Sequence, residues 1–162
     1  WSKMQGTLEA KRIEPDEEYI IPLGKADRIQ EASDEYIQSG ESAVVITYGM
    51  GIYWATEASK SFVGRIEIMD LRTLNPLDWE SIEQSVKKHG RAFVLTEEPL
   101  LNSFAESLAG RISKEMFNYL DAPVWTFGAV DLPAVPLNVE LEKMMMPNAE
   151  KVKIELDKLL GF

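Results

Sequence analysis

Residues 65–78 read RIEIMDLRTLNPLD, and this stretch decides the fold. The apolar run within 65–69 ends in charge at Asp70, which is typical of a buried strand that reaches the edge of a sheet. Asn75 then has the form of a helix N-cap, with Pro76 at the first helical position and Asp78 two residues on. The stretch therefore predicts a strand, a loop and a helix, which is the repeating unit of an α/β domain.

The neighbouring segments continue this alternation. Short apolar runs rich in β-branched or aromatic residues predict further buried strands at 42–48, 92–95 and 123–127. Apolar residues at helical spacing predict helices at 52–62, at 76–88, from Ser103 onward and through 152–160, while 26–37 suits either a helix or a strand. We expect a three-layer α/β fold with a mostly parallel five-stranded sheet and helices on both faces. Residues 1–20 are expected to be an N-terminal arm or linker and 21–162 the folded domain.

Two of the expected helices carry capping signals. Ser103 and Glu106 form a capping box at the start of one helix. Gly90 suits the C-cap of the 76–88 helix, and His89, the only histidine, lies just before it. We expect the imidazole to interact with the free carbonyls at this helix end. One histidine without cysteine does not make a usual zinc site, so no metal ligands are predicted.

The composition limits the classes of partner. Lys and Arg total 17 against 27 Asp and Glu, and the resulting net charge of −10 disfavours nucleic acid and anionic membranes. A basic protein module is a better partner for such a surface. The lack of cysteine excludes disulfides and thiol catalysis and fits a reducing compartment, so we expect a cytoplasmic protein. The chain begins at Trp1 without a methionine, which suggests a fragment or a processed product.

Five runs occur in an order that resembles a known family. They read IPLGKA at 21–26, TYG at 47–49, DLRTLNPLD at 70–78, LTEEP at 95–99 and YLDAP at 119–123. The set resembles the C-terminal domain of thiamine-diphosphate enzymes of the transketolase superfamily, and most closely that of the beta subunit of 2-oxo acid dehydrogenase first components. Many relatives have histidine where this chain has Thr96, so no role of that imidazole is carried over.

The resemblance implies an architectural domain of a larger enzyme. The parent would oxidatively decarboxylate pyruvate or a branched-chain 2-oxo acid and pass the acyl group to lipoamide, using thiamine diphosphate and a divalent cation. The family's Gly-Asp-Gly diphosphate signature is absent here, so we expect no catalytic, cofactor-binding or metal-binding residue and no activity of the isolated domain. Expected partners are a second beta subunit, an alpha subunit or fused alpha portion, and the subunit-binding domain of the lipoyl acyltransferase.

Two other functions stay open. The equivalent domain of a transketolase or deoxyxylulose-phosphate synthase would need basic residues for sugar phosphates near the carboxyl ends of the strands, and this chain is poor in them there. A free-standing, non-enzymatic α/β interaction domain would also explain the acidity and the lack of catalytic residues.

Four candidate site residues follow predicted strands. Asp70 and Arg72 flank the loop of the 65–78 stretch, where the arginine would bind a carboxylate across a subunit interface or brace its own loop. Glu97 and Glu98 end another strand, at the edge where α/β sheets bind ligands. One of them would act as a general acid or base, or both would belong to a solvated edge or an interface; neighbours in an extended segment point to opposite sides.

The remaining candidates concern partners and a turn. By resemblance, Asp121 and the Phe162 carboxylate would accept hydrogen bonds from arginines of the subunit-binding domain, with inert termini as the alternative. Residues 48–51, Tyr-Gly-Met-Gly, are interpreted as a tight strand-to-helix turn rather than an anion site, because the full GxGxxG pattern is absent. Residues 144–146, three methionines, are either a flap over the core or an adaptable partner surface.

Overall fold

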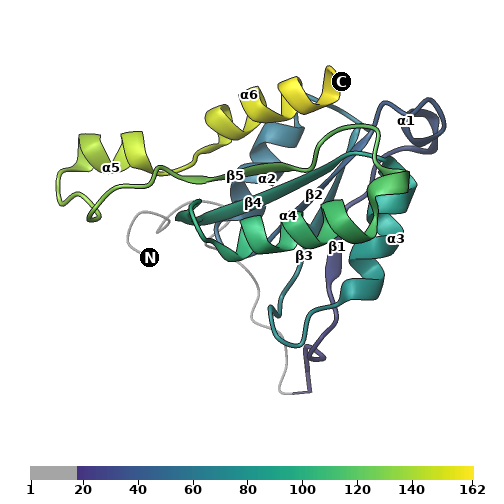
Figure 1. The fold of residues 1–162 in the computed structure, drawn as a ribbon, viewed down its shortest axis with the longest axis horizontal. Helices are drawn as coiled ribbons and strands as arrows, with labels where there is room; N and C mark the ends of the chain where they lie inside the picture. The colour runs from purple at the N-terminus through teal and green to yellow at the C-terminus, as the bar shows by residue number, and fades with distance from the viewer. Residues whose placement is uncertain (1–17) are drawn as a thin grey trace.

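The computed structural model describes residues 18–162, so most of the expected N-terminal arm lies outside the described residues. These residues form a five-stranded sheet in the order β1-β3-β2-β4-β5 (Figure 1). Strands β2 to β5 are parallel, and only β1 is antiparallel, paired with β3. The strands are β1 Asp27–Gln30, β2 Ala43–Thr47, β3 Ile66–Asp70, β4 Ala92–Pro99 and β5 Trp125–Ala129. The expected mostly parallel sheet is confirmed.

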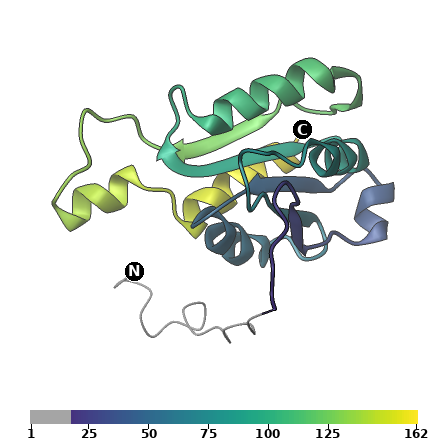
Figure 2. The same ribbon diagram turned by 90° about the horizontal axis from the view of Figure 1, so that it is seen from below.

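Helices cover both faces of the sheet, as Figure 2 shows. The helices are α1 Asp34–Gln38, α2 Gly51–Ser59, α3 Trp79–His89, α4 Phe104–Glu115, α5 Val139–Met145 and α6 Ala149–Leu160, with a 3₁₀ turn at Phe117–Tyr119. One core lies between the sheet and helices α2 and α6, and the other lies between the sheet and helices α3 and α4. The three-layer architecture is therefore confirmed.

Successive residues of the central strands supply the two cores alternately. On β2, Val45 points to the α2 and α6 side, whereas Val44 and Ile46 point to the α3 and α4 side, and all three are fully buried. This alternation follows from the two-residue period of a strand. It explains why β2 reads as a continuous apolar run, since both of its faces are covered.

Helix α3 begins at Trp79, three residues later than Pro76, where the sequence pattern placed its start. The N-cap is Asp78, not Asn75, because the Asp78 carboxylate accepts hydrogen bonds from the Ser81 backbone N–H at 3.2 Å and the Ser81 hydroxyl at 2.8 Å. The same carboxylate accepts from the Ala26 N–H at 3.0 Å. Asp78 therefore joins the start of α3 to the chain entering β1.

Several other predicted boundaries and caps agree with the structure. Ser103 Oγ accepts from the Glu106 N–H at 3.0 Å and caps α4, whereas the Glu106 carboxylate accepts from the Asn102 N–H rather than completing the predicted capping box at Ser103. Gly90 ends α3 in the left-handed conformation, with φ of 67°. Residues 26–37, for which the sequence suited either a helix or a strand, include strand β1 and most of the short helix α1 that follows it. Helix α2 ends at Ser59, three residues before the predicted Phe62.

Candidate functional site

The sheet places four of the six predicted site residues at one end. Strands β2 to β5 all finish at this end, called here the carboxyl edge. Strand β2 lies between β3 and β4, and the helices that follow β2 and β3 pack on opposite faces. This is the point at which open α/β sheets bind ligands. Glu97 and Glu98 lie beside it on β4, with Asp70 and Arg72 at the end of β3.

Glu98 is held by three donors at the carboxyl edge. The Tyr48 hydroxyl, just after β2, donates to Glu98 Oε1 at 2.8 Å and lies 2.8 Å from Thr96 Oγ1. The Phe104 backbone N–H at the start of α4 also donates to Glu98 Oε1, at 3.0 Å, and the Thr96 hydroxyl lies 3.3 Å from the same oxygen. The carboxylate thus satisfies one of the free N–H groups at the start of α4.

The environment keeps the Tyr48 phenol protonated. Burial raises its pKa to about 12, with the negative charge of Glu98 adding to the increase and the hydrogen bond to Thr96 opposing it. The ring also packs edge-on against Phe104, with centroids 5.9 Å apart. Tyr48 is therefore a hydrogen-bond donor that joins β2, β4 and α4, and this arrangement favours a structural role for Glu98 over a role as general base.

The two adjacent glutamates have separate surroundings. Glu97 is exposed and lies near Gly49, since a Cβ added to that glycine would be 3.8 Å from Glu97 Oε1. The Gly49 backbone is left-handed, and a Cβ on Gly51 would lie 1.9 Å from Thr47 Oγ1. These glycines are required by chain geometry and close packing, which supports the interpretation of residues 48–51 as a turn.

Arg72 braces the loop after β3 within this chain. Its backbone, with φ of 55°, is turned so that the N–H donates to Asp70 Oδ1 at 3.0 Å. Its guanidinium donates to Asp27 Oδ2 on β1 at 2.5 Å. Burial raises the pKa of Asp70, and the bond from the Arg72 N–H opposes that increase. These contacts agree with the role of Arg72 in bracing its own loop. Its role at a subunit interface stays a prediction.

Asp121 and Phe162 lie at the opposite end of the sheet, called here the amino edge. The Asp121 N–H donates to the Gly90 carbonyl at 2.7 Å, next to the start of β4. Phe162 is 61% exposed and packs edge-on against Trp125, the first residue of β5, with ring centroids 5.9 Å apart. The six predicted residues therefore do not form one site, because four lie at one edge and two at the other.

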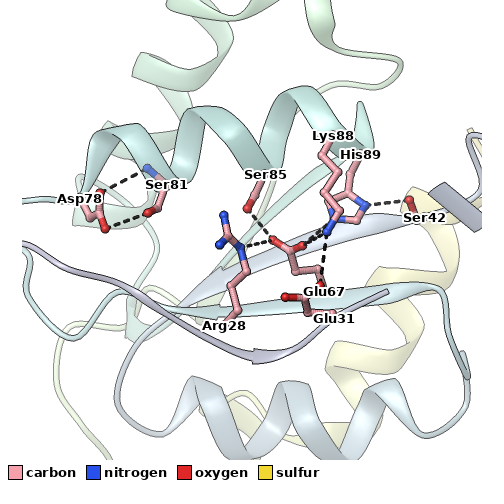
Figure 3. A network of polar contacts seen from close by, with 9 residues as sticks. All are labelled: Arg28, Glu31, Ser42, Glu67, Asp78, Ser81, Ser85, Lys88 and His89. Carbon is pink, nitrogen blue, oxygen red and sulfur yellow. Dashed lines mark hydrogen bonds and ion pairs between the residues drawn. The ribbon is translucent and has the colours of Figure 1, made fainter. Parts of the chain in front are cut away.

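A buried polar network was missed by the sequence interpretation. Glu67, in the middle of β3, is fully buried among charged and polar partners (Figure 3). Its carboxylate lies 3.1 Å from His89 Nε2 and accepts from Lys88 Nζ at 2.8 Å and from Ser85 Oγ at 2.5 Å. Arg28 Nε lies 3.6 Å from Oε1 of this carboxylate, the oxygen that Ser85 also contacts.

These partners keep Glu67 ionised. Burial alone would raise its pKa, but the hydrogen bonds from His89, Lys88 and Ser85 prevail and lower it to about 2. A glutamate inside a run otherwise typical of a buried strand was the available signal, because a buried carboxylate needs donors. The donors come from the last turns of α3, so only the fold brings them close.

The expectation that His89 interacts with the carbonyls at the end of α3 is wrong. The imidazole is buried and points into the network, with Nε2 toward Glu67 and Nδ1 2.7 Å from the Ser42 hydroxyl. The left-handed Gly90 ends the helix instead, and its N–H donates to the Val86 carbonyl. The network thus joins α3 to β3 and to the residue that precedes β2.

Within residues 18–162, no cluster of three or more His, Cys, Asp or Glu side chains could hold a metal ion. In the same part of the chain, no helix is both long and apolar enough to cross a membrane.

The sequence is similar to the beta subunits of two 2-oxo acid dehydrogenases. The chain is 33% identical over 139 residues to the pyruvate dehydrogenase E1 component subunit beta of Rhizobium meliloti, a match covering 84% of this chain and 28% of the relative. It is 33% identical over 155 residues to the 2-oxoisovalerate dehydrogenase subunit beta of Bacillus subtilis, covering 91% and 44%. The chain thus spans less than half the length of either relative.

A solved structure and a family model agree on the fold. The chain superposes with a TM-score of 0.68 and 20% identity on a protein named as a split gene transketolase, inactive beta4 tetramer, covering 89% of this chain and 44% of that one. Residues 34–152 match the model of the transketolase C-terminal domain, which is well over half of the chain. On this match, the chain belongs to the family of transketolase C-terminal domains.

Proposed function

We propose that this chain is the C-terminal, non-catalytic domain of the beta subunit of a thiamine-diphosphate-dependent 2-oxo acid dehydrogenase, or of a fused alpha-beta form. The parent enzyme oxidatively decarboxylates pyruvate or a branched-chain 2-oxo acid and transfers the acyl group to lipoamide. The observation that carries the proposal is the similarity, at 33% identity over most of this chain, to beta subunits named for those two substrate classes. The lack of cysteine, which fits a reducing compartment, supports a cytoplasmic location.

The carboxyl edge does not suit the diphosphate of thiamine diphosphate. A diphosphate needs backbone donors or basic side chains, yet Glu97 and Asp70 stand at the carboxyl edge, and the Arg72 guanidinium is paired with Asp27. The Phe104 N–H at the start of α4 is already bonded to Glu98. The cofactor would therefore be held by other parts of the parent enzyme, and this domain contributes shape and contacts.

The two edges of the sheet suit different partners. Asp70, Arg72, Glu97 and Glu98 at the carboxyl edge are proposed to face a second beta subunit, where further ionic contacts would add to the internal brace. At the amino edge, Asp121 and the carboxylate of exposed Phe162 are proposed to receive arginines of the lipoyl acyltransferase's subunit-binding domain. The net charge of −10 would speed the approach of such a basic module.

Calorimetric titration with thiamine diphosphate and Mg²⁺ tests the non-catalytic assignment. The isolated chain is expected to show no binding, and the intact parent assembled with its alpha subunit is expected to bind both. Micromolar binding by the isolated chain would refute the assignment. A parent that binds the cofactor yet transfers ketol groups between sugar phosphates would instead support the transketolase alternative.

A further inference from the structure

Residues 130–144, called here the apolar arm, leave the end of β5 and project away from the body with helix α5. Figures 1 and 2 show this projection from two directions. Leu137 is fully exposed and Met144 is 69% exposed. The exposed large apolar residues of the arm are Val130, Leu132, Val135, Leu137, Val139, Leu141 and Met144. Seven exposed large apolar side chains within one short segment indicate an interaction surface.

The arm is held at its base. The Val130 N–H donates to the Met145 carbonyl at 3.0 Å, and the Met145 side chain is buried. Lys151 Nζ on α6 donates to the carbonyls of Lys143, Met144 and Met146 at 2.8–3.0 Å. Because these bonds orient α5 before any partner arrives, less conformational entropy is lost on binding.

Among residues 18–162, the tip of the arm makes no polar contact with the rest of the chain. No hydrogen bond or ion pair within the described residues joins 131–137 to other segments, and the structure leaves nearly all of this stretch exposed. Of the methionines at 144–146, Met145 is buried, as expected for a flap over the core. Met144 is exposed, as expected for a partner surface. The outward side chains are therefore available to a partner.

Charge identifies the kind of partner. The arm carries Asp131, Glu140 and Glu142 against Lys143 alone, so its net charge is −2, and the whole chain has a net charge of −10. Packing the arm against the arm of a second copy would bring two net charges of −2 together, whereas a basic surface would attract it. The exposed leucines and valines require an apolar groove.

We propose that the apolar arm inserts into an apolar groove, rimmed by lysine or arginine, on a different chain of the assembly. Under the proposed function, on which this assignment rests, that chain is the alpha subunit or the fused alpha portion. The arm is then an anchor between chains, separate from the polar contacts proposed at the two edges of the sheet.

The test uses the intact parent of this chain with its alpha subunit. A double variant, Leu137→Asp with Leu141→Asp, places two carboxylates on the arm. The control, Val63→Asp with Phe117→Asp, also replaces two exposed apolar residues by aspartate, at positions outside the arm. Affinity for the alpha subunit is measured by calorimetry, the oligomeric state of the beta chain alone by light scattering, and folding by circular dichroism.

The arm variant is expected to bind the alpha subunit about tenfold more weakly or worse, while the control binds within about twofold of the unmodified chain and both remain folded. Unchanged affinity of a folded arm variant overturns the arm assignment and leaves the proposed function standing. Failure of the unmodified chain to bind any alpha subunit overturns both. If the beta chain alone forms a dimer and the arm variant is a monomer, the arm binds a second copy of the chain. This result also overturns the assignment.

Discussion

Nε2 of His89 lies 3.1 Å from Oε2 of Glu67, and both side chains are fully buried between α3 and the sheet. Lys88 completes the contact from the same helix end at 2.8 Å, and it also lies 3.8 Å from Glu31 beyond β1. One buried carboxylate thus fixes the last turn of α3 against β3. A buried charge left without its partners is costly, so this contact is a sensitive point of the fold.

Glu67→Gln removes the charge and leaves Lys88 and Arg28 without their buried partner. The free energy of unfolding at pH 7 is expected to fall by about 3 kcal/mol, measured by urea denaturation. Glu83→Gln, which removes an exposed partner of Lys87 on the same helix, serves as the control and is expected to change stability by less than about 0.5 kcal/mol. An equal loss of unfolding free energy in the two variants would mean that the buried network adds no more stability than an exposed ion pair.

The same network predicts how acid acts on the domain. The pKa of Glu67 in the folded chain is about 2, below its ordinary value of 4.5. Its stabilisation is therefore complete above pH 4.5 and is lost as the pH falls toward 2. The loss is on the order of 3 kcal/mol. Stability curves from pH 7 to pH 2 should be flatter for Glu67→Gln than for the unmodified chain, and parallel curves would contradict the low pKa.

Adjacent glutamates on β4 offer a matched pair of variants. Glu98→Gln weakens the bonds from Tyr48, Thr96 and the start of α4, so a loss of about 1–2 kcal/mol is expected in chemical denaturation. Glu97→Gln alters an exposed side chain and is expected to cost less than about 0.5 kcal/mol. A larger loss for Glu97 than for Glu98 would contradict the described arrangement.

The arginine of the 65–78 stretch is predicted to act both within the chain and between chains. Asp27→Asn removes only the internal ion pair of Arg72, while Arg72→Ala removes the guanidinium altogether. Each is expected to cost the isolated chain at most about 1 kcal/mol, because the pair is partly exposed. If Arg72 also contacts a second beta subunit, Arg72→Ala weakens beta-beta association, measured by sedimentation, more than Asp27→Asn does. Equal association would leave only the internal role.

Docking of a basic module at the amino edge is tested with the subunit-binding domain of a lipoyl acyltransferase. Deletion of Phe162, or Asp121→Asn, is expected to weaken binding about fivefold or more at low salt, with a smaller difference at high salt because the contacts are ionic. Asp131→Asn, which makes the same change at the other edge, should leave the affinity unaltered. An affinity that is unchanged by both the Phe162 deletion and Asp121→Asn would rule out the amino edge as the docking surface.

Local signals in the sequence predicted much of the fold. The start of α4 follows from Ser103, whose hydroxyl makes the expected cap, and the end of α3 follows from left-handed Gly90. The start of α3 was misplaced because Pro76 is compatible with a first helical turn, whereas the decisive cap depends on Asp78 bonding to Ser81. Local propensity alone does not choose between these two starts.

The polar contacts depend on residues far apart in the chain, which is why the sequence interpretation missed them. Glu67 meets His89 22 positions later, and Tyr48 meets Glu98 50 positions later. The sequence shows each of these residues, but strand order and helix packing determine which of them form contacts. The family resemblance carried information about the fold that spacing alone does not contain, and the matched family model confirmed it.

The most direct measurement of the central claim is the activity of the intact parent, assembled with its alpha subunit and supplied with thiamine diphosphate and Mg²⁺. Decarboxylation of pyruvate or of a branched-chain 2-oxo acid, coupled to acylation of a lipoyl domain, is the expected result, and residues 1–162 alone should be inert. Ketol transfer between sugar phosphates with no turnover of any 2-oxo acid would contradict the account.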